Sequence, residues 1–477
     1  MQSIQPVLRG FHPDPSWVHV NGWTYLVTST FGWLPGLPVY RSRDLVHWAP
    51  LPPAIPDTRH LDYRGCGVDD GLYAPGIRHD GRRFLLACTL VRRKEQRFQN
   101  FICVSEDPVR GWSPPVMMPE SLGRIDPTTF SDDDGSLWLV LNDLPAAAHS
   151  HGATRSIRLW RLNPESLQPE DGPYVLWHGA MVGAATPEAP RLFRRDGWYW
   201  LLIAEGGTGR NHAVTLARSR SITGPYEGCP ANPLLTHRHL DPAHPVQCVG
   251  HADLMRDGDG KWQACCLAER RVNGLTLMGR ETWTLPVSWP TGEWPVFAPD
   301  AGILGMHGEG AFLDSTWIGL RTAPESLMAE PGLLPARPHA WSDTQHAPSL
   351  LGRRIREFTG SWSLILRPEH KALTCGLAIF CTDSAWLRLT WCGRSLTLEN
   401  AEGQIFARDT LPETDQLDLE LAWSPEGVRA AWSTAEAGRT LDALVPLHAF
   451  APPVFAGAVA CVWTRGENGR LRFRPVG

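Results

Sequence analysis

Five polar or aromatic side chains recur at one position of a repeat within the first 300 residues of this chain. Each repeat has a short strand, a glycine turn and a second strand rich in aromatic residues, and the turn glycines are Gly22, Gly81, Gly135, Gly197 and Gly260. Eight or nine residues before these glycines stand Asp14, Tyr73, Asp126, Glu188 and His251. Equivalent positions of a repeat that closes into a ring face the same axis, so we predict that these five side chains line one site.

The three carboxylates of this set suit the cleavage of a glycosidic bond. One carboxyl group must be protonated to release the leaving oxygen, and another must be ionised to activate water or to attack carbon. A third can tune the pKa of the acid and orient the substrate, because like charges oppose each other's ionisation. Nearby prolines stiffen the backbone around Asp14, Asp126 and Glu188. The alternative for each is a turn residue or a solvated loop carboxylate.

The other two positions leave alternatives open. Tyr73 could stack on a sugar ring or fill a gap between neighbouring sheets. His251 could hydrogen-bond the sugar, bind a central water or a divalent cation, or serve as a structural histidine. One histidine is a poor metal signature, so we predict no metal site and no cofactor.

The elements that must position these residues are short strands. About twenty residues after each glycine a second strand-like run follows, and long amphipathic helical patterns are absent up to residue 300, which argues against a TIM barrel. Three or four strands per repeat are typical of a propeller blade. We therefore predict an all-β chain: a five-bladed β-propeller over residues 1–300, a linker over 301–316 and a β-sandwich over 317–477.

Composition excludes several classes of partner. The net charge is −5, with Lys+Arg 45 against Asp+Glu 50, and no basic stripe is visible, so neither nucleic acid nor an anionic membrane has electrostatic support. No apolar window is long enough to span a bilayer, and the start resembles no signal peptide. The 11 cysteines form no CxxC pair. We therefore expect reduced thiols and a cytoplasmic location. From the three carboxylates we expect a small oligosaccharide or glycoside as the partner, and the chain could also form a homo-oligomer.

Further motifs connect the chain to a known family. They run in order along most of the sequence: residues 11–16, 25–31, 42–48, 125–127, 188–190, 202–208, 217–219, 221–226, 250–254, 279–282 and 350–354. On these residues the chain resembles glycoside hydrolase family 43, in particular its β-xylosidase members with a C-terminal β-sandwich.

The resemblance implies an inverting hydrolase with Asp14 as general base and Glu188 as general acid. It implies that Asp126 modulates the pKa of the acid and orients the substrate, and that Phe31 and Arg280 line the pocket for the non-reducing sugar. The family's sandwich commonly lends an aromatic side chain to that pocket, and Phe455 is the candidate here.

The chain also departs from the family pattern. Tyr73 stands where a tryptophan is usual, and Ala189 and Arg191 replace a common glycine and histidine after the acid. We expect an exo-glycosidase that releases terminal β-D-xylosyl, or else α-L-arabinofuranosyl, residues from short oligosaccharides. Two alternatives remain: a retaining fructan-type hydrolase or transferase on five blades, and a sugar-binding propeller without catalysis.

Overall fold

Antiparallel sheets make up almost all of the regular structure. The computed structural model describes residues 6–143, 155–181, 186–304, 314, 316–328, 330–451 and 456–476. Helix is confined there to α1 (Pro324–Leu327) and two short 3-10 turns, Glu120–Leu122 and Leu447–Ala449. No helix in the described part of the chain is long and apolar enough to cross a membrane. The predicted all-β class is therefore confirmed.

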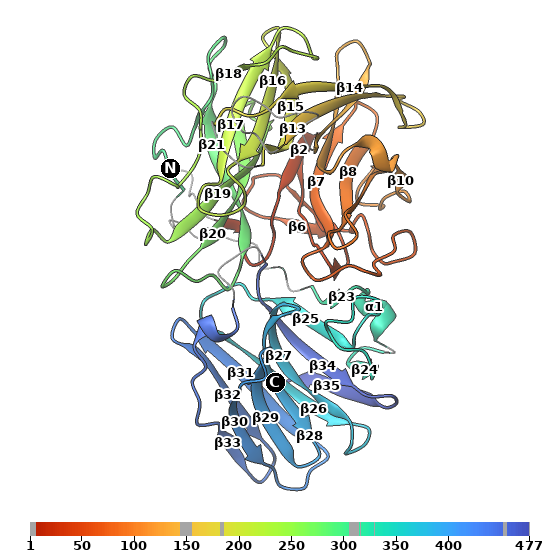
Figure 1. Ribbon diagram of the computed structural model, residues 1–477, viewed down its shortest axis with the longest axis vertical. Coiled ribbons are helices and arrows are strands. Elements are labelled where there is room, and N and C mark those ends of the chain that lie inside the picture. Colours follow the sequence, from red (N-terminus) through yellow and green to blue (C-terminus); the bar gives the residue numbers. More distant parts are fainter. Residues whose placement is uncertain are drawn as a thin grey trace.

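Five sheets follow one another along the first 300 residues, and each is an antiparallel meander that starts at its innermost strand (Figure 1). The first two contain β2 (Ser16–Val20), β3 (Trp23–Val27), β5 (Val39–Ser42) and β6 (Ala49–Leu51), then β7 (Gly71–His79), β8 (Phe84–Arg92), β9 (Arg97–Ser105) and β10 (Val116–Met117). The third and fourth contain β11 (Ile125–Ser131), β12 (Leu137–Asp143), β13 (Ser156–Leu162) and β14 (Pro169–Trp177), then β15 (Glu188–Arg195), β16 (Trp198–Glu205), β17 (Ala213–Ser219) and β18 (Glu227–Gly228).

The fifth sheet joins the two ends of this series. It contains β19 (Val246–Arg256), β20 (Trp262–Arg270), β21 (Arg280–Ser288) and β22 (Val296–Phe297), and β1 (Pro6–Leu8) pairs with β21 from the start of the chain. The innermost strands contact one another in the cyclic order β2, β7, β11, β15, β19 and back to β2. The five sheets therefore form a closed ring.

Hydrophobic clusters fill each of the five joints of this ring. Tyr25 of the first sheet packs in one cluster with Phe84 of the second, and Leu85 of the second packs with Leu139 of the third. Two further clusters join the third to the fourth sheet and the fourth to the fifth. The last cluster joins Trp17 to Met255 and so returns from the fifth sheet to the first. The buried apolar area at these joints holds the ring closed.

Two larger sheets form the lower half of the molecule in Figure 1. One has the order β30 (Ile405–Thr410), β29 (Ser395–Asn400), β28 (Ala385–Cys392), β27 (Thr374–Thr382), β34 (Val459–Arg465), β25 (Leu350–Arg354), β23 (Ile318–Leu320) and β4 (Trp33–Leu34). The other has the order β24 (Leu333–Pro335), β35 (Arg470–Pro475), β26 (Gly360–Pro368), β31 (Leu417–Ser424), β32 (Gly427–Ser433) and β33 (Gly438–Thr440). One cluster of leucines from both sheets, with Leu364 and Leu377 among them, forms their common core.

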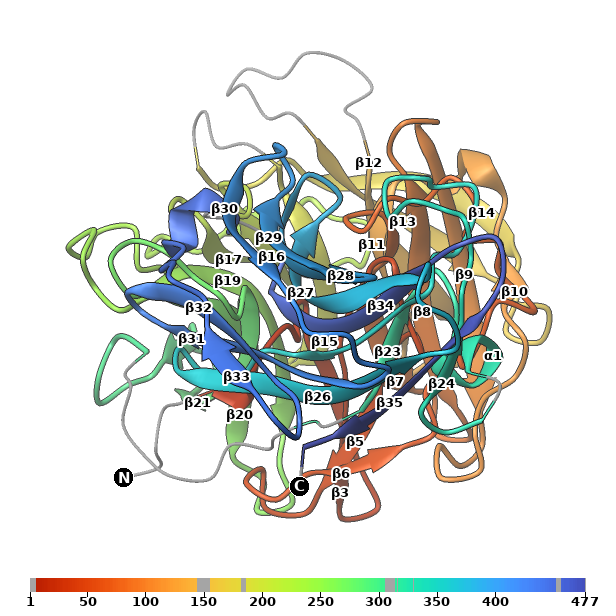
Figure 2. The same cartoon turned by 90° about the horizontal axis from the view of Figure 1, so that it is seen from below.

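The two halves are joined by a shared strand. β4 lies in the sequence of the first half, yet it pairs with β23 and forms the edge of the eight-stranded sheet. Trp33 of β4 is 2% exposed and meets Phe380 edge-on at 5.8 Å. Viewed from below, the second half covers one end of the ring (Figure 2). A two-residue strand is too short to show an alternating pattern. The sequence analysis therefore did not predict that a strand from the first 300 residues pairs with a sheet of the second half.

Candidate active site

The backbone is kinked in the innermost strand of each sheet in the ring or, in the first sheet, just before it. The five kinked residues have positive φ: Asp14 (55°), Ala74 (36°), Asp126 (63°), Ala189 (53°) and His251 (49°). In four sheets the register between the innermost strand and the second strand also shifts beside the kink, as it does at a β-bulge. Bulges turn side chains out of the regular alternation, and strained backbone is often found at functional sites. The kinks explain how the repeated positions present their side chains to the centre of the ring.

A cavity of about 300 Å³ lies where these kinks meet. Seven of the eight residues predicted for the site line it: Asp14, Phe31, Tyr73, Asp126, Glu188, His251 and Arg280. The eighth, Phe455, lies outside the described residues. The chain just after it passes close to the cavity wall, because a Cβ on Gly279 would stand 2.6 Å from the backbone nitrogen of Gly457.

Asp14 is held in one orientation by two donors. Ser29 Oγ donates to Asp14 Oδ2 at 2.7 Å, and Arg280 Nη1 donates to Asp14 Oδ1 at 2.9 Å. The hydroxyl of Ser29 also accepts the backbone N–H of Ala74 at 2.7 Å, which ties the first sheet to the second. An oriented carboxylate with a guanidinium beside it is suited to accept a proton from water or to act as a nucleophile.

Asp126 and Glu188 are two further buried carboxyl groups that line the cavity. Burial, and then the Asp126 carboxylate, raise the pKa of Glu188, while Arg155 acts in the opposite direction. Burial and Asp14 likewise raise the pKa of Asp126, whose Oδ2 accepts the N–H of Ala189 at 2.9 Å. Because burial and a nearby negative charge both oppose ionisation, Glu188 favours its protonated form. That proton is what a general acid needs.

Aromatic rings and a guanidinium form the adjoining wall. Phe31 is 1% exposed, meets Tyr73 edge-on at 4.7 Å and stacks on Phe11 at 5.4 Å. The guanidinium of Arg280 lies 5.5 Å from the centre of the Phe31 ring. The Tyr73 hydroxyl donates to the backbone carbonyl of Asp69, so its ring is fixed. Apolar ring faces beside polar groups suit a sugar, which offers C–H faces and hydroxyl edges.

Comparison with known proteins identifies the family of this chain. The sequence profile of glycosyl hydrolases family 43 matches residues 4–295. The chain belongs to that family and is a glycoside hydrolase. A xylosidase/arabinosidase from Butyrivibrio fibrisolvens is 33% identical over 413 residues, which cover 80% of this chain and 78% of that protein.

Other family 43 proteins resemble the chain over a similar length. A non-reducing end α-L-arabinofuranosidase from Bacteroides ovatus is 32% identical over 79% of this chain and 73% of its own length. Among solved structures, a xylan β-1,4-xylosidase from Bacillus halodurans C-125 superposes with a TM-score of 0.87 at 25% identity, covering 99% of this chain and 100% of its own. The match extends beyond the family profile into the second half of the molecule.

Two neutral histidines lie at the floor of the family 43 site. Burial lowers the pKa of His251, and the cationic Arg191 and the neighbouring His212 lower it further. Burial also lowers the pKa of His212, whose Nδ1 lies 3.1 Å from the carbonyl oxygen of Cys248. Among the described residues, no other side chains join His251 to form a group of three with metal-ligand spacing. The surroundings of His251 therefore favour a neutral imidazole.

The family 43 pocket also contains residues that the sequence analysis missed. Arg93, Arg155, Thr186, Thr208 and His212 all line it. Arg155 Nη1 lies 3.3 Å from Glu188 Oε2, and Arg93 pairs with Asp70 at 2.7 Å. None of them occupies the repeated position before a turn glycine, so the repeat could not reveal them. Only Thr208 stood in a segment that resembled the family.

Proposed function

We propose that this protein is an inverting exo-glycosidase that releases terminal β-D-xylosyl residues from short oligosaccharides. In this mechanism Glu188 protonates the leaving oxygen while Asp14 takes a proton from the water that attacks the opposite face of the anomeric carbon. Asp126 does not touch the reacting bond. Its negative charge keeps Glu188 protonated, and it orients the substrate.

One observation carries this proposal: the three carboxyl groups have different surroundings in one cavity. Glu188 is buried beside Asp126, whereas Asp14 accepts hydrogen bonds from Ser29 and Arg280. When two carboxyl groups have surroundings that favour different protonation states, the group that stays protonated can act as the acid and the ionised group as the base. Family membership supports the same division of roles.

The size and lining of the cavity support a single terminal sugar as the bound unit. About 300 Å³ is at the small end for ligand sites, and Phe31, Tyr73 and Arg280 close one wall. Relatives carry the names xylosidase/arabinosidase and β-xylosidase. The relative from Bacteroides ovatus is named an α-L-arabinofuranosidase, so α-L-arabinofuranosyl is the second candidate substrate.

We also propose how the architecture serves this function. The closed ring of five sheets is a five-bladed β-propeller over residues 1–300, a linker spans 301–316, and the two larger sheets form a β-sandwich over 317–477. The position of Gly457 against Gly279, beside Arg280, supports a contribution of Phe455 to the pocket. The catalytic steps need no cofactor, and the eleven unpaired cysteines, ten of them buried, support a cytoplasmic location.

The test is to follow hydrolysis of p-nitrophenyl β-D-xyloside and p-nitrophenyl α-L-arabinofuranoside by NMR. We expect the xyloside to have the higher kcat/KM and the first product to be the anomer of inverted configuration. Retained configuration would overturn the mechanism and favour the fructan-type alternative. Absence of turnover with both glycosides, together with sugar binding, would favour a binding protein.

A further inference from the structure

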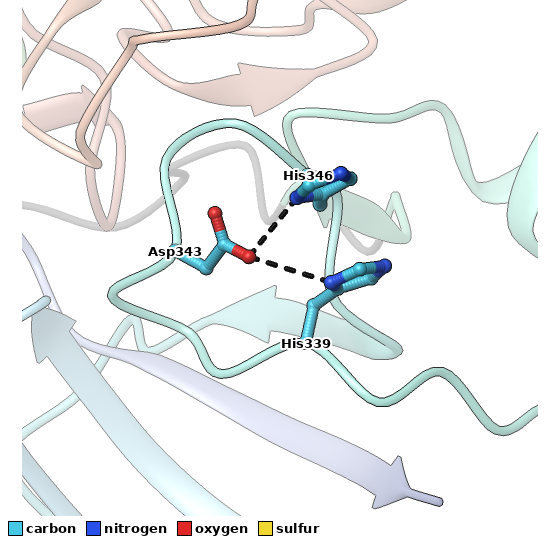
Figure 3. Close-up of side chains that lie close together, drawn as sticks. All are labelled: His339, Asp343 and His346. Carbon is cyan, nitrogen blue, oxygen red and sulfur yellow. Dashed lines mark hydrogen bonds and ion pairs between the residues drawn. The ribbon is translucent and has the colours of Figure 1, made fainter. Parts of the chain in front are cut away.

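A group of potential metal-ligating side chains lies outside the lining of the catalytic pocket, in the connection between β24 and β25. This segment, residues 336–349, contains His339, Asp343 and His346 (Figure 3). The Nδ1 atoms of both histidines face one carboxylate oxygen, Asp343 Oδ2, at 3.3 Å and 3.0 Å. Among the described residues, this is the one group of three His, Cys, Asp or Glu whose ligand atoms gather this closely.

The backbone that carries these side chains is held in place by a buried arginine. Arg321 is 4% exposed, and its guanidinium donates to the carbonyl oxygens of Trp341, Asp343 and His346 at 2.8, 3.2 and 3.2 Å. The N–H of Gly65 donates to the carbonyl of Thr344 at 2.9 Å, which fixes the segment to the first half of the molecule. A rigid support of this kind lets a site exist before its ligand arrives.

Hydrogen bonds within the segment also orient the carboxylate. The N–H of Gln345 donates to Asp343 Oδ1 at 3.0 Å, so the other oxygen, Oδ2, faces the two imidazoles. Neighbours that occupy the second oxygen of a ligating carboxylate are typical of metal sites. In the metal-free protein, Nδ1–H groups would donate to Oδ2 in the place where an ion would bind.

The spacing fits a small divalent ion of borderline softness. Zinc binds histidine nitrogen and carboxylate oxygen at about 2.0–2.2 Å in tetrahedral geometry, which places neighbouring ligand atoms about 3.4 Å apart. The two nitrogen–oxygen separations here, 3.3 and 3.0 Å, lie close to that length. The rings stack at 4.0 Å with an angle of 3° between their planes, so they must tilt to aim both nitrogens at one ion. The His346 side chain is 55% exposed and has room to turn.

We propose that His339, Asp343 and His346 bind a zinc ion, with water as the fourth ligand. Both imidazoles bind the ion through an unprotonated Nδ1 and carry their proton on Nε2; a ring that is neutral beforehand moves its proton from Nδ1 to Nε2, and an imidazolium releases one proton to solvent. A cavity of about 580 Å³, lined by His60 and Arg64 on one side and Gln345 and His346 on the other, gives solvent access. Because the segment is fixed to Gly65, bound zinc would stabilise the contact between the two halves of the molecule.

The test is calorimetric titration of the full, tag-free protein with zinc chloride in two buffers of different ionisation enthalpy. We expect one equivalent to bind, with protons released to the buffer only by a histidine that was an imidazolium beforehand, and the melting temperature to rise with zinc and return with a chelator. His346→Ala and His339→Ala should each weaken binding by more than about tenfold. His47→Ala is the matched control and should leave zinc binding unchanged. His47 pairs with Asp44 at 2.7 Å on the surface, and within the described residues it belongs to no group of three possible ligands.

Equal zinc binding by the wild type and a His339→Ala/His346→Ala double variant would overturn the proposal. So would a wild type that takes up no zinc, because the group would then be a hydrogen-bonded histidine pair. If the variants fold poorly, cobalt(II) titration of the wild type decides instead. We expect the intense visible absorption of four-coordinate cobalt, and the weak spectrum of the hexaaqua ion would contradict the site.

Discussion

Three carboxyl groups of one chemical type have different immediate neighbours in this pocket. Glu188 and Asp126 are both buried; the Asp126 carboxylate raises the pKa of Glu188, and Asp14 raises the pKa of Asp126. Asp14 has a hydroxyl and a guanidinium as donors. The residue types were readable from the sequence, but their neighbours were not. Arg155, which opposes the protonation of Glu188, had no recognisable motif.

Replacing Glu188 by glutamine should remove the general acid while preserving the shape of the pocket. We expect kcat/KM on xylobiose to fall by about 10²–10⁴-fold. On an aryl glycoside with a good leaving group the loss should be much smaller, because that group departs without a proton. Steady-state kinetics on both substrates measure the difference, with Glu227→Gln on the exposed strand β18 as control. Equal losses on the two substrates would contradict the acid role.

Replacing Arg155 by methionine should shift the alkaline limit of activity to higher pH. A cation favours the ionised form of a nearby carboxyl group, so its removal raises the pKa of Glu188 further. The general acid works only when protonated, so activity should persist to higher pH in the variant. The pH profile of kcat/KM measures this shift. Arg161→Met, at an exposed position of β13, the strand that follows Arg155, should leave the profile unchanged.

At the scale of elements, the bulged inner strands bring the site together. Gly76 of β7 lies just past the kink at Ala74 and faces the third sheet. A Cβ at this position would stand 2.7 Å from the carbonyl oxygen of Pro127 and 2.5 Å from Thr128 Oγ1. This close approach sets the spacing between β7, which carries Tyr73, and β11, which carries Asp126.

Gly76→Ala should therefore destabilise the protein and disturb the pocket. Overpacking against backbone typically costs about 1–3 kcal/mol in the free energy of unfolding. We also expect kcat to fall, because Asp126 immediately precedes Pro127. Urea denaturation and kinetics test this pair of effects. Gly258→Ala is the control, since a Cβ there meets only the His19 ring at 3.5 Å, an ordinary contact.

At the scale of the whole molecule, the two halves are parts of one structure. β4 from the first half extends a sheet of the second, and Trp33 is buried in a cluster with Phe380 and Trp463. Arg354 of the second half donates to the carbonyl oxygen of Phe11, beside the pocket. The second half therefore supports the active-site wall from below.

Trp33→Ala should lower the free energy of unfolding by about 3–5 kcal/mol, as expected for a large aromatic removed from a core. Because the cluster spans both halves, we expect calorimetry to show one transition in the wild type and two in the variant. Trp23→Ala, which removes a half-buried ring that stacks on Arg41 and Arg43, should cost less and leave one transition. A single transition in the Trp33 variant would show that this cluster does not couple the halves.

The sequence alone determined the class of fold, the catalytic family and the residues at the repeated position. Strands with alternating apolar residues, turn glycines and acidic residues at one position of the repeat are local features. They can be read without knowing which strands pair. The tertiary structure decided what depends on contacts between distant segments. Three features depend on such contacts: the position of Arg155 beside Glu188, the pairing of β4 with a sheet of the second half, and the approach of His339 and His346 to Asp343. No local sequence pattern records which surfaces meet after folding.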